Sequence, residues 1–501
     1  MNRSPSLLRQ LLCRRWIWHQ LSPLLVFAFS LLLLFHVTTI RNPYEESQTA
    51  QEAPTPGLPQ REGASERRPG GRVERVVGAE VTEKPPPPPP PPLQRLPSMG
   101  GSWANPKQWM AYPRAVVAER EAALTGARRV TLATQASLDR LALLPELVNH
   151  WDGPVSVALF TPDVEHPLAA AFVAYLRRCH AVIRQRVTFS LLVPVNRPPR
   201  PLGGSGQFAS SPCGATRETL SSVLRRRPAS VTAWRQKMPY PQNTLRNLAR
   251  NASLTEFVWV VDVDVVPVAG AASALDEFLV SRAAHSCWRC VFVVPTYEVD
   301  ERERFPESAE RLLELVRKKR ARPFHEKVLI HNQFATNHSR WQSHVLNFNK
   351  TAISHPVTNF EFFYEPFFVS RNDVPEYDER FVGYGFTRNT QTYETLCAGY
   401  KFVVLAPLFS VHWGLQVRKT RPGWREQQNN NNRKLFNAFK KDVFARYGAD
   451  PLGMVNKNLG RSEKSAKKRT IRVARGAGPV KGREGNGAGV SRGTGANGRV
   501  R

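Results

Sequence analysis

The sequence is poor in cysteine, and the spacing of its cysteines argues against a zinc site. The six are Cys13, Cys179, Cys213, Cys287, Cys290 and Cys397. Only Cys287 and Cys290 are close neighbours, and a zinc site would need a second ligand pair at suitable spacing, which the sequence lacks. We therefore interpret Cys287-Trp-Arg-Cys290 as a short disulfide or a redox pair and expect no metal there.

Acidic side chains are also scarce, with 41 Asp and Glu against 71 Lys and Arg and a formal net charge of +30. Such an excess would by itself suggest a nucleic-acid partner. The charge is concentrated at the two ends, however. Residues 457–501 hold 13 basic and 2 acidic side chains (13 − 2 = +11), and four arginines lie within residues 1–20. The middle of the chain is far less basic. We expect no nucleic-acid partner, mainly because the membrane topology predicted from the next segment places the basic tail in the lumen.

Residues 21–40 carry no formal charge. At about 1.5 Å per helical residue they span about 30 Å, the thickness of the hydrocarbon core of a bilayer. The preceding arginines place residues 1–20 in the cytosol and the rest of the chain in the lumen. A cleaved signal peptide would need small residues at its cleavage site, which Thr38-Thr39-Ile40-Arg41 lacks. We expect an uncleaved, single-pass type II anchor.

Composition divides the rest of the chain into three parts. Residues 41–102 are polar and Pro-rich, with eight consecutive prolines at 85–92, so we expect an extended stem. Residues 103–455 should form one large globular domain. Residues 456–501 should form a disordered basic tail, either simply solvated or bound to acidic glycans or lipids.

Two features concern the predicted luminal location of the globular domain. Five cysteines follow the anchor, and an odd number in an oxidising compartment leaves at least one thiol free or paired between chains. Three sequons can accept N-glycans if they are exposed in the lumen. Their asparagines are Asn251, Asn337 and Asn349.

Within the globular domain, short apolar runs alternate with segments of helical periodicity. This alternation predicts an α/β fold with a largely parallel sheet, in which ligands bind beyond the carboxyl ends of the strands. The predicted strands cover residues 130–134, 154–160, 187–195, 257–265, 291–299, 362–370 and 401–406. The predicted helices cover residues 137–151, 167–180, 216–226, 242–251, 271–282 and 424–447, the last with a break at 429–432.

The sharpest chemical signal is the segment FVWVVDVDVVP at residues 257–267. Because side chains alternate along a strand, Asp262 and Asp264 should point to the same side at the end of a buried strand. Two such carboxylates repel each other unless a cation lies between them. Oxygen ligands suit Mn²⁺ or Mg²⁺, which would stabilise a nucleoside diphosphate as a leaving group. The alternative is a pair of solvated carboxylates in a turn.

Other residues are candidates for the same site. His412, after the strand at 401–406, is a candidate metal ligand or else a structural histidine. On the helix at 242–251, Asn243, Arg246 and Arg250 share a face that either contacts phosphates or forms surface salt bridges. Four acids compete for the role of the base that deprotonates an acceptor hydroxyl, with ion pairing to a nearby arginine as the structural alternative. They are Asp378, Glu379, Glu365 and Glu394.

A series of segments, in order along the chain, resembles one known family, the LARGE-type glycosyltransferases (glycosyltransferase family 49). The segments are LATQASLDRL, WDGPVSVALF, YPQNTLRNLAR, VVDVDVVP, TNHSRW, EPFFV, YDERFVGYGFTRNTQ and FSVHWG. The resemblance covers roughly residues 129–447. Residues 324–334 differ from the family in character, and Thr387 stands where its pattern has asparagine.

This resemblance implies a GT-A fold, a Rossmann-like mixed sheet with flanking helices, held on the type II anchor in the Golgi membrane. It implies inversion at the anomeric carbon, Mn²⁺ bound by Asp262, Asp264 and His412, and a UDP-sugar whose uridine meets Thr134 and Gln135. A glucuronyltransferase of this family moves glucuronic acid from UDP-glucuronate to a xylose primer on the O-mannosyl glycan of alpha-dystroglycan, where matriglycan begins.

We therefore expect UDP-glucuronate as the donor, a glycoprotein glycan as the acceptor and a complex with another LARGE-type transferase. An N-acetylglucosaminyl- or xylosyltransferase of the same fold is one alternative. A non-catalytic, glycan-binding luminal protein is another, and the intact Asp pair with His412 argues against it.

Overall fold

The computed structural model describes residues 108–418 and 422–455, which belong to one compact unit. They correspond to the globular domain predicted over 103–455. The predicted cytosolic segment 1–20, anchor 21–40, stem 41–102 and tail 456–501 lie outside the described residues. Within the described ranges, no helix has both the length and the apolar character needed to cross a bilayer.

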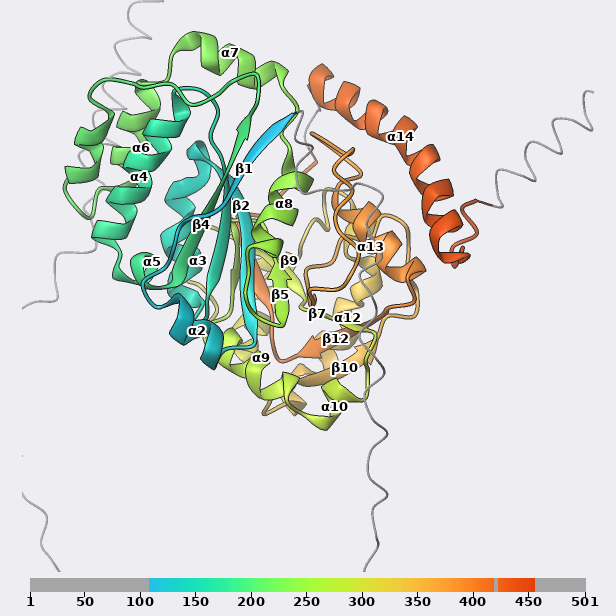
Figure 1. Cartoon of the computed structure of the whole chain (residues 1–501). Helices are drawn as coiled ribbons and strands as arrows, with labels where there is room; N and C mark the ends of the chain where they lie inside the picture. The colour runs from blue at the N-terminus through green and yellow to red at the C-terminus, as the bar shows by residue number, and fades with distance from the viewer. Residues whose placement is uncertain (1–107, 419–421, 456–501) are drawn as a thin grey trace, which may run out of the picture. The chain divides into compact units, whose positions relative to one another are not determined.

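A nine-stranded mixed sheet has the order β1-β4-β3-β2-β5-β11-β7-β12-β10 (Figure 1). Strands β4, β3, β2 and β5 are parallel, and β1 is antiparallel at the edge. All six residues of β3 are buried, as expected for a parallel strand covered on both faces. The bounds are β1 (Trp109–Val116), β2 (Val130–Ser137), β3 (Val155–Phe160), β4 (Val187–Pro194) and β5 (Phe257–Val260).

The second half of this sheet is not the largely parallel arrangement that the sequence predicts. Strand β11 runs antiparallel to both β5 and β7, β12 runs parallel to β7, and β10 is antiparallel at the far edge. The reversal at β11 makes the sheet mixed. The bounds are β7 (Cys290–Val293), β10 (Ala352–Pro356), β11 (Phe368–Arg371) and β12 (Lys401–Ala406).

A smaller sheet has the order β6-β13-β8-β9. Its strands are β6 (Val265–Pro267), β8 (Thr296–Val299), β9 (Ala321–Pro323) and β13 (Ser410–Trp413). The predicted strands 257–265 and 291–299 are each divided, because the chain leaves the large sheet after β5 or β7 and enters the small sheet at β6 or β8. The first of these crossings contains Asp262 and Asp264, which therefore lie where the two sheets meet.

Helices cover both faces of the large sheet. Helix α8 (Gln242–Asn251) packs on β2 and β3 through Leu245 and Leu248, whereas α4 (Glu165–Cys179) buries Leu168 and Phe172 in the core on the other side. The remaining α-helices are α2 (Glu121–Ala127), α3 (Leu144–His150), α5 (Ala181–Arg186), α6 (Thr216–Arg225), α7 (Ala229–Lys237), α9 (Ala271–Leu279), α10 (Arg282–His285), α11 (Ala309–Arg317), α12 (His338–His344), α13 (Arg388–Cys397) and α14 (Gly423–Tyr447). Short 3-10 turns are η1 (Leu138–Leu143), η2 (Ser205–Ser210), η3 (Ile330–Asn332), η4 (Phe334–Thr336) and η5 (Val345–Asn347).

The long helix α14 lies beside α13 (Figure 1) and corrects one prediction. It runs without interruption through residues 429–432, where the asparagine run suggested a break. The Asn432 side-chain NH₂ donates to the carbonyl oxygens of Val382, Tyr384 and Gly385 at 3.0, 3.2 and 2.8 Å. These amide contacts to a neighbouring turn compensate for the low helix propensity of asparagine.

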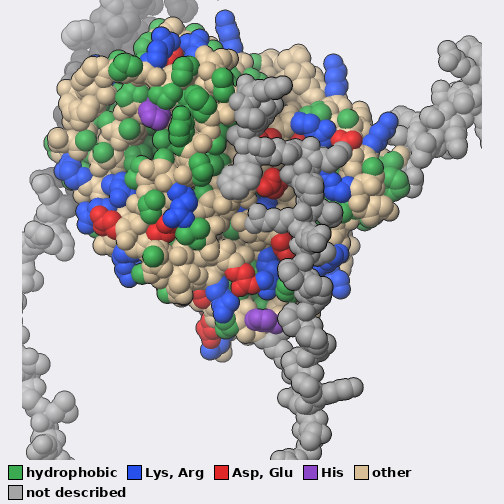
Figure 2. Space-filling view, in the orientation of Figure 1, with side chains coloured by type: hydrophobic (Ala, Val, Ile, Leu, Met, Phe, Trp, Pro, Cys, Tyr) green, Lys and Arg blue, Asp and Glu red, His purple; other side chains and the backbone are tan. Residues whose placement is uncertain are grey.

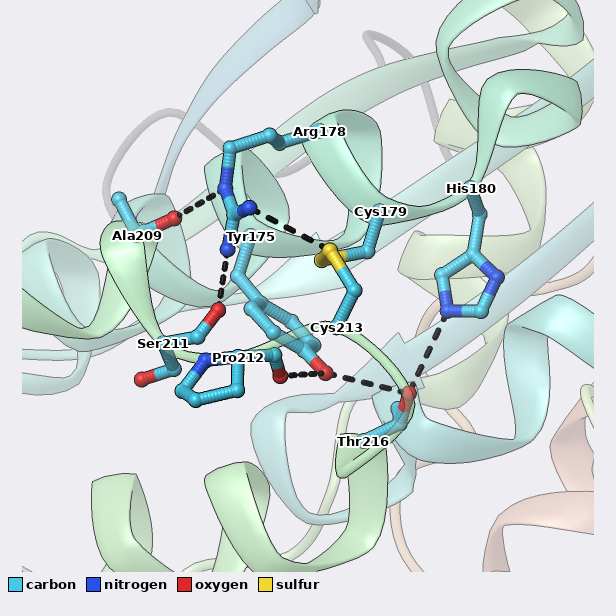
Figure 3. The surroundings of a disulfide bond; sticks show 9 residues. All are labelled: Tyr175, Arg178, Cys179, His180, Ala209, Ser211, Pro212, Cys213 and Thr216. Atoms are coloured by element: carbon cyan, nitrogen blue, oxygen red, sulfur yellow. Dashed lines mark hydrogen bonds between the residues drawn. A yellow bond between two sulfur atoms is a disulfide. The ribbon is translucent and has the colours of Figure 1, made fainter.

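Two disulfides are present in the described part of the chain. Cys287 pairs with Cys290, which confirms a short disulfide, and Cys179 pairs with Cys213. Figure 3 shows that Cys213 lies in a loop held by Arg178, which donates to Ala209 O at 2.8 Å and also to Ser211 O. Cys397 is free and buried, in agreement with the odd cysteine count.

Candidate active site

The Asp262-Val263-Asp264 segment follows β5 directly, at the carboxyl end of the parallel strands. Val261 and Val263 are buried, whereas the carboxylate side chains remain 32% and 28% exposed. The alternation that the sequence predicts is therefore present: the apolar side chains enter the core, and the two acids share the open side.

Two arginines hold Asp262. Arg246 of α8 and Arg388 of α13 each donate to Asp262 Oδ1, at 3.1 and 2.9 Å. Both arginine side chains are only 6% exposed, and their guanidinium groups lie over the rings of Tyr377 and Phe367. Burial alone would raise the pKa of Asp262, but the charges of Arg388 and Arg246 hold it well below its usual range. Asp262 is thus ionised at any physiological pH.

Asp264 has different neighbours. Its Oδ2 accepts from Arg140 of η1 and lies 3.5 Å from Nε2 of His412. The sheet register explains the second contact, because His412 of β13 pairs with Val265 of β6, the residue after Asp264. A separation of 3.5 Å allows one cation to bind both atoms at about 2.1 Å from each.

The predicted metal set is therefore only partly assembled. Asp264 and His412 converge, while Asp262 is held by its arginines. Among the described residues, no group of three or more His, Cys, Asp or Glu side chains is arranged as a complete metal cluster. A carboxylate oxygen and an imidazole nitrogen fit Mn²⁺ or Mg²⁺ as two ligands, and metal binding by all three residues stays a prediction.

His325 is a site residue that the sequence analysis missed. It follows β9, stacks on Phe324, and Phe324 in turn lies 5.3 Å from the ring of His412. Burial, together with the nearby His412, lowers the pKa of His325 to about 4, so the imidazole is neutral. The segment 324–334 has no recognisable pattern. Only the position of the small sheet, which depends on the whole fold, brings His325 near Asp264.

Thr134 and Gln135, the two residues predicted to contact the uridine, lie in different environments. Gln135 accepts a hydrogen bond from the hydroxyl of Tyr240 at 2.6 Å, on the side of the sheet covered by α8. Thr134 is fully buried, and its hydroxyl has no hydrogen-bond partner among the described residues. Adjacent strand residues point to opposite faces, so of these two predicted residues it is Gln135, together with Tyr240, that lies on the same side of the sheet as Arg246.

Helix α8 is buried rather than a salt-bridging surface. Every residue from Asn243 to Arg250 is buried. Asn243 accepts from Arg246 at 3.2 Å and donates to the carbonyl oxygen of Asp378 at 2.9 Å. Arg250 donates to the backbone of residues 372–375 and so has a structural role. Of the predicted helix face, only Arg246 contacts the Asp pair.

The four candidate general bases lie in two separate regions of the structure. Glu365 lies within electrostatic range of the first aspartate and its arginines: burial raises the pKa of Glu365, Arg388 and Arg246 oppose this effect, and Asp262 adds to it. The other three acids line a different, small pocket, together with Arg446. There Asp378 pairs with Arg380 at 2.6 Å, Glu379 accepts from Asn247 at 2.9 Å, and Glu394 accepts from Arg446.

The predicted glycosylation sites differ in accessibility. Asn337 and Asn349 are exposed, although the side-chain oxygen of Asn337 accepts from the backbone of Arg340 at 3.1 Å. Asn251 is half-buried and donates to Glu376 at 2.9 Å. On the face shown in Figure 2, the described Lys and Arg side chains are dispersed and form no single basic patch.

A family model described as glycosyl-transferase for dystroglycan matches residues 129–448. The chain belongs to this glycosyltransferase family. The resemblance of its sequence segments to LARGE-type transferases is thereby confirmed, and the chain is a glycosyltransferase. As such it takes a nucleotide-sugar donor and a glycan acceptor.

Among the relatives of this glycosyltransferase is beta-1,4-glucuronyltransferase 1 of Homo sapiens, 33% identical over 332 residues that cover 64% of this chain and 77% of that protein. Xylosyl- and glucuronyltransferase LARGE1 of Mus musculus is 26% identical over 325 residues, covering 64% of this chain and 36% of that protein. A solved structure of S. aureus TarS 1-349 in complex with UDP matches at 12% identity with a TM-score of 0.30, over 57% of this chain and 60% of that one.

Proposed function

We propose that this glycosyltransferase has a GT-A fold and transfers glucuronic acid, with inversion, from UDP-glucuronate to a xylose primer on an O-mannosyl glycan. Family membership and the names of the relatives support the reaction. The observation that carries the proposal is the position of Asp262, Asp264 and His412 at the carboxyl edge of β5, beside buried arginines. This edge is where α/β sheets bind nucleotides.

Asp264 and His412, with Asp262, would hold Mn²⁺, or Mg²⁺, and such a cation neutralises a departing diphosphate. Arg246 and Arg388 keep Asp262 ionised and fix its orientation. Gln135 and Tyr240 would meet the uridine from the α8 side of the sheet.

Glu365 is the acid that we assign as general base. It lies within electrostatic range of Asp262, burial raises its pKa, and a carboxylate with a raised pKa is the stronger base. The Asn332 side chain donates to Glu365 Oε2 and orients it. Asp378 and Glu379 belong to a separate cluster, in which they accept hydrogen bonds from three side chains of α8 and hold this helix to the segment 378–379.

We also propose that the domain acts in the Golgi lumen on a single-pass type II anchor at 21–40. N-glycans on Asn337 and Asn349, and a complex with another LARGE-type transferase, would accompany this location. The exposure of both asparagines supports glycosylation. A glycosidase-sensitive mobility shift that becomes smaller in Asn337→Gln and in Asn349→Gln, and smaller again in the double variant, would test it. The absence of any shift in secretory cells would contradict luminal exposure.

The test of the reaction is a donor screen with the full-length protein, a xyloside acceptor and Mn²⁺. We expect transfer from UDP-glucuronate. Transfer from UDP-xylose or UDP-N-acetylglucosamine alone would move the assignment to the alternatives, of which xylosyl transfer is favoured by the double name of the LARGE1 relative.

Matched variants make the screen specific to the site. Asp264→Asn should abolish transfer, whereas Asp152→Asn should retain it. The two carboxylates are equally exposed, at 28% and 30%, and each pairs with an arginine, but Asp152 lies before β3 at the opposite edge of the sheet. Full activity in Asp264→Asn would refute the metal site. Glu365→Gln should lose turnover while keeping UDP binding.

A further inference from the structure

The side chain of Arg140 differs from the other arginines of the site. It projects from η1, the 3-10 turn that follows β2, and the buried side chains of Leu138 and Leu141 anchor that turn in the core. The Arg140 side chain is nonetheless 51% exposed. Within the described part of the chain, its one hydrogen-bond or ion-pair partner is the Oδ2 atom of Asp264.

Arg246 and Arg388 are fixed by several contacts each. Both are 6% exposed and lie over aromatic rings, and each has a second acceptor besides Asp262, which is Asn243 for Arg246 and the Val260 carbonyl for Arg388. An exposed pair such as Arg140–Asp264 is weak and easily exchanged in water. Of the three arginines, Arg140 is the one that can leave its carboxylate without a large rearrangement.

The atom that Arg140 holds is the atom that a cation would need. Asp264 Oδ2 is the carboxylate oxygen that lies 3.5 Å from His412 Nε2. A divalent cation between these two atoms would lie within a few ångströms of the guanidinium, and the two positive charges would repel each other. Cation binding and the Arg140–Asp264 contact therefore compete.

The acid next to Arg140 in sequence, Asp139, is not free to take a released Arg140. It is already paired with Arg227 at 2.8 Å and Arg235 at 3.1 Å. The nearest anion available would be one that the donor brings. The planar guanidinium binds both phosphate and carboxylate oxygens in a bidentate geometry.

We propose that Arg140 is a donor-binding residue that is released from Asp264 by the divalent cation and then binds an anionic group of the nucleotide-sugar. This inference rests on the proposed function. The anionic group is either the diphosphate or the carboxylate of a uronic acid. The cation and the donor would then bind cooperatively, because the first frees a contact for the second.

The test compares calorimetric binding of UDP, UDP-glucose and UDP-glucuronate to the full-length protein with and without Mn²⁺. In Arg140→Ala we expect binding in Mn²⁺ to weaken about tenfold or more, the range for loss of one charged hydrogen bond. An equal loss for all three ligands identifies the diphosphate, and a loss for UDP-glucuronate alone identifies the carboxylate. Mn²⁺ alone, followed by electron paramagnetic resonance, should bind Arg140→Ala more tightly than the wild type.

Arg129→Ala is the matched control. Arg129 immediately precedes β2, at the opposite end from Arg140, is 46% exposed and pairs with Glu256. It removes the same charge and should leave all affinities unchanged. If Arg140→Ala binds the three ligands as the wild type does, Arg140 is only a counter-ion of Asp264 and the inference is wrong. If the wild type itself fails to bind UDP in Mn²⁺, the proposed function fails as well.

Discussion

Replacing Asp262 by asparagine should destabilise the protein, whereas the same change at Asp264 should not. Asp262 is the shared partner of two arginines that are 6% exposed, and its loss leaves two buried cations unpaired. Breaking a buried ion pair costs about 3–5 kcal/mol. Because Asp262 itself is 32% exposed, water screens part of this, and we expect about 2–3 kcal/mol. Asp264 pairs with the half-exposed Arg140, so its replacement should cost about 1 kcal/mol or less.

Thermal unfolding of the two single variants measures this difference. For a chain of this length we expect Tm to fall by about 4–6 °C in Asp262→Asn and by less than about 2 °C in Asp264→Asn. Both variants should lose transferase activity. The aspartates would then be equivalent in function and unequal in stability, which activity assays alone cannot distinguish.

The pH dependence has a definite sign. The folded-state pKa of Asp262 is depressed, so its contribution is fully present above the unfolded-state pKa, about 3.9, and is lost as the pH falls through the folded-state value. The stability difference between wild type and Asp262→Asn should be constant from about pH 5 to 8 and should shrink only in strong acid. An equal loss of stability in Asp264→Asn, or a difference that vanishes near neutral pH, would refute the ion-pair argument.

Three further predictions concern parts of the fold outside the Asp pair. Replacing Cys179 and Cys213 together by serine opens a loop of 34 residues and should cost about 3–4 kcal/mol in denaturant unfolding; a loss below about 1 kcal/mol would show that the loop is held by other contacts. Burial raises the pKa of Glu394 to about 7, so this residue makes the folded state less stable as pH rises from about 5 to 7, and Glu394→Gln should give a flatter stability curve, whereas an unchanged slope would contradict the assignment. Gly385→Ala should lower Tm and activity, because φ is +86° and a Cβ would lie 2.3 Å from the side-chain oxygen of Asn429; the control Gly126→Ala, with nothing within 4 Å of the new Cβ, should do neither.

Local sequence patterns predicted correctly the helices and strands that stay in one helix or one sheet along their whole length. The predicted helix 242–251 and strand 401–406 have the observed bounds, because each run stays within one element of the fold along its whole length. The run 257–265 misled, since valine is favoured in either sheet and nothing local records that the chain changes sheets within it. The asparagine run at 429–432 misled for a related reason: the side chain of Asn432 donates to the turn at 382–385, which is distant in sequence.

The candidate site shows the same limit in its chemistry. The Asp pair could be found because its spacing, its apolar strand and its position at a strand end are all local properties. The side chains that contact each acid come from distant parts of the chain. Arg246 and Arg388, on two different helices, donate to Asp262, and the pairing of β13 with β6 brings His412 to Asp264. The structure therefore divides a pair that looks symmetrical in sequence into one carboxylate that arginines hold permanently and one that can exchange an arginine for a cation. That asymmetry makes Asp264, rather than Asp262, the position at which cation and donor binding should be coupled.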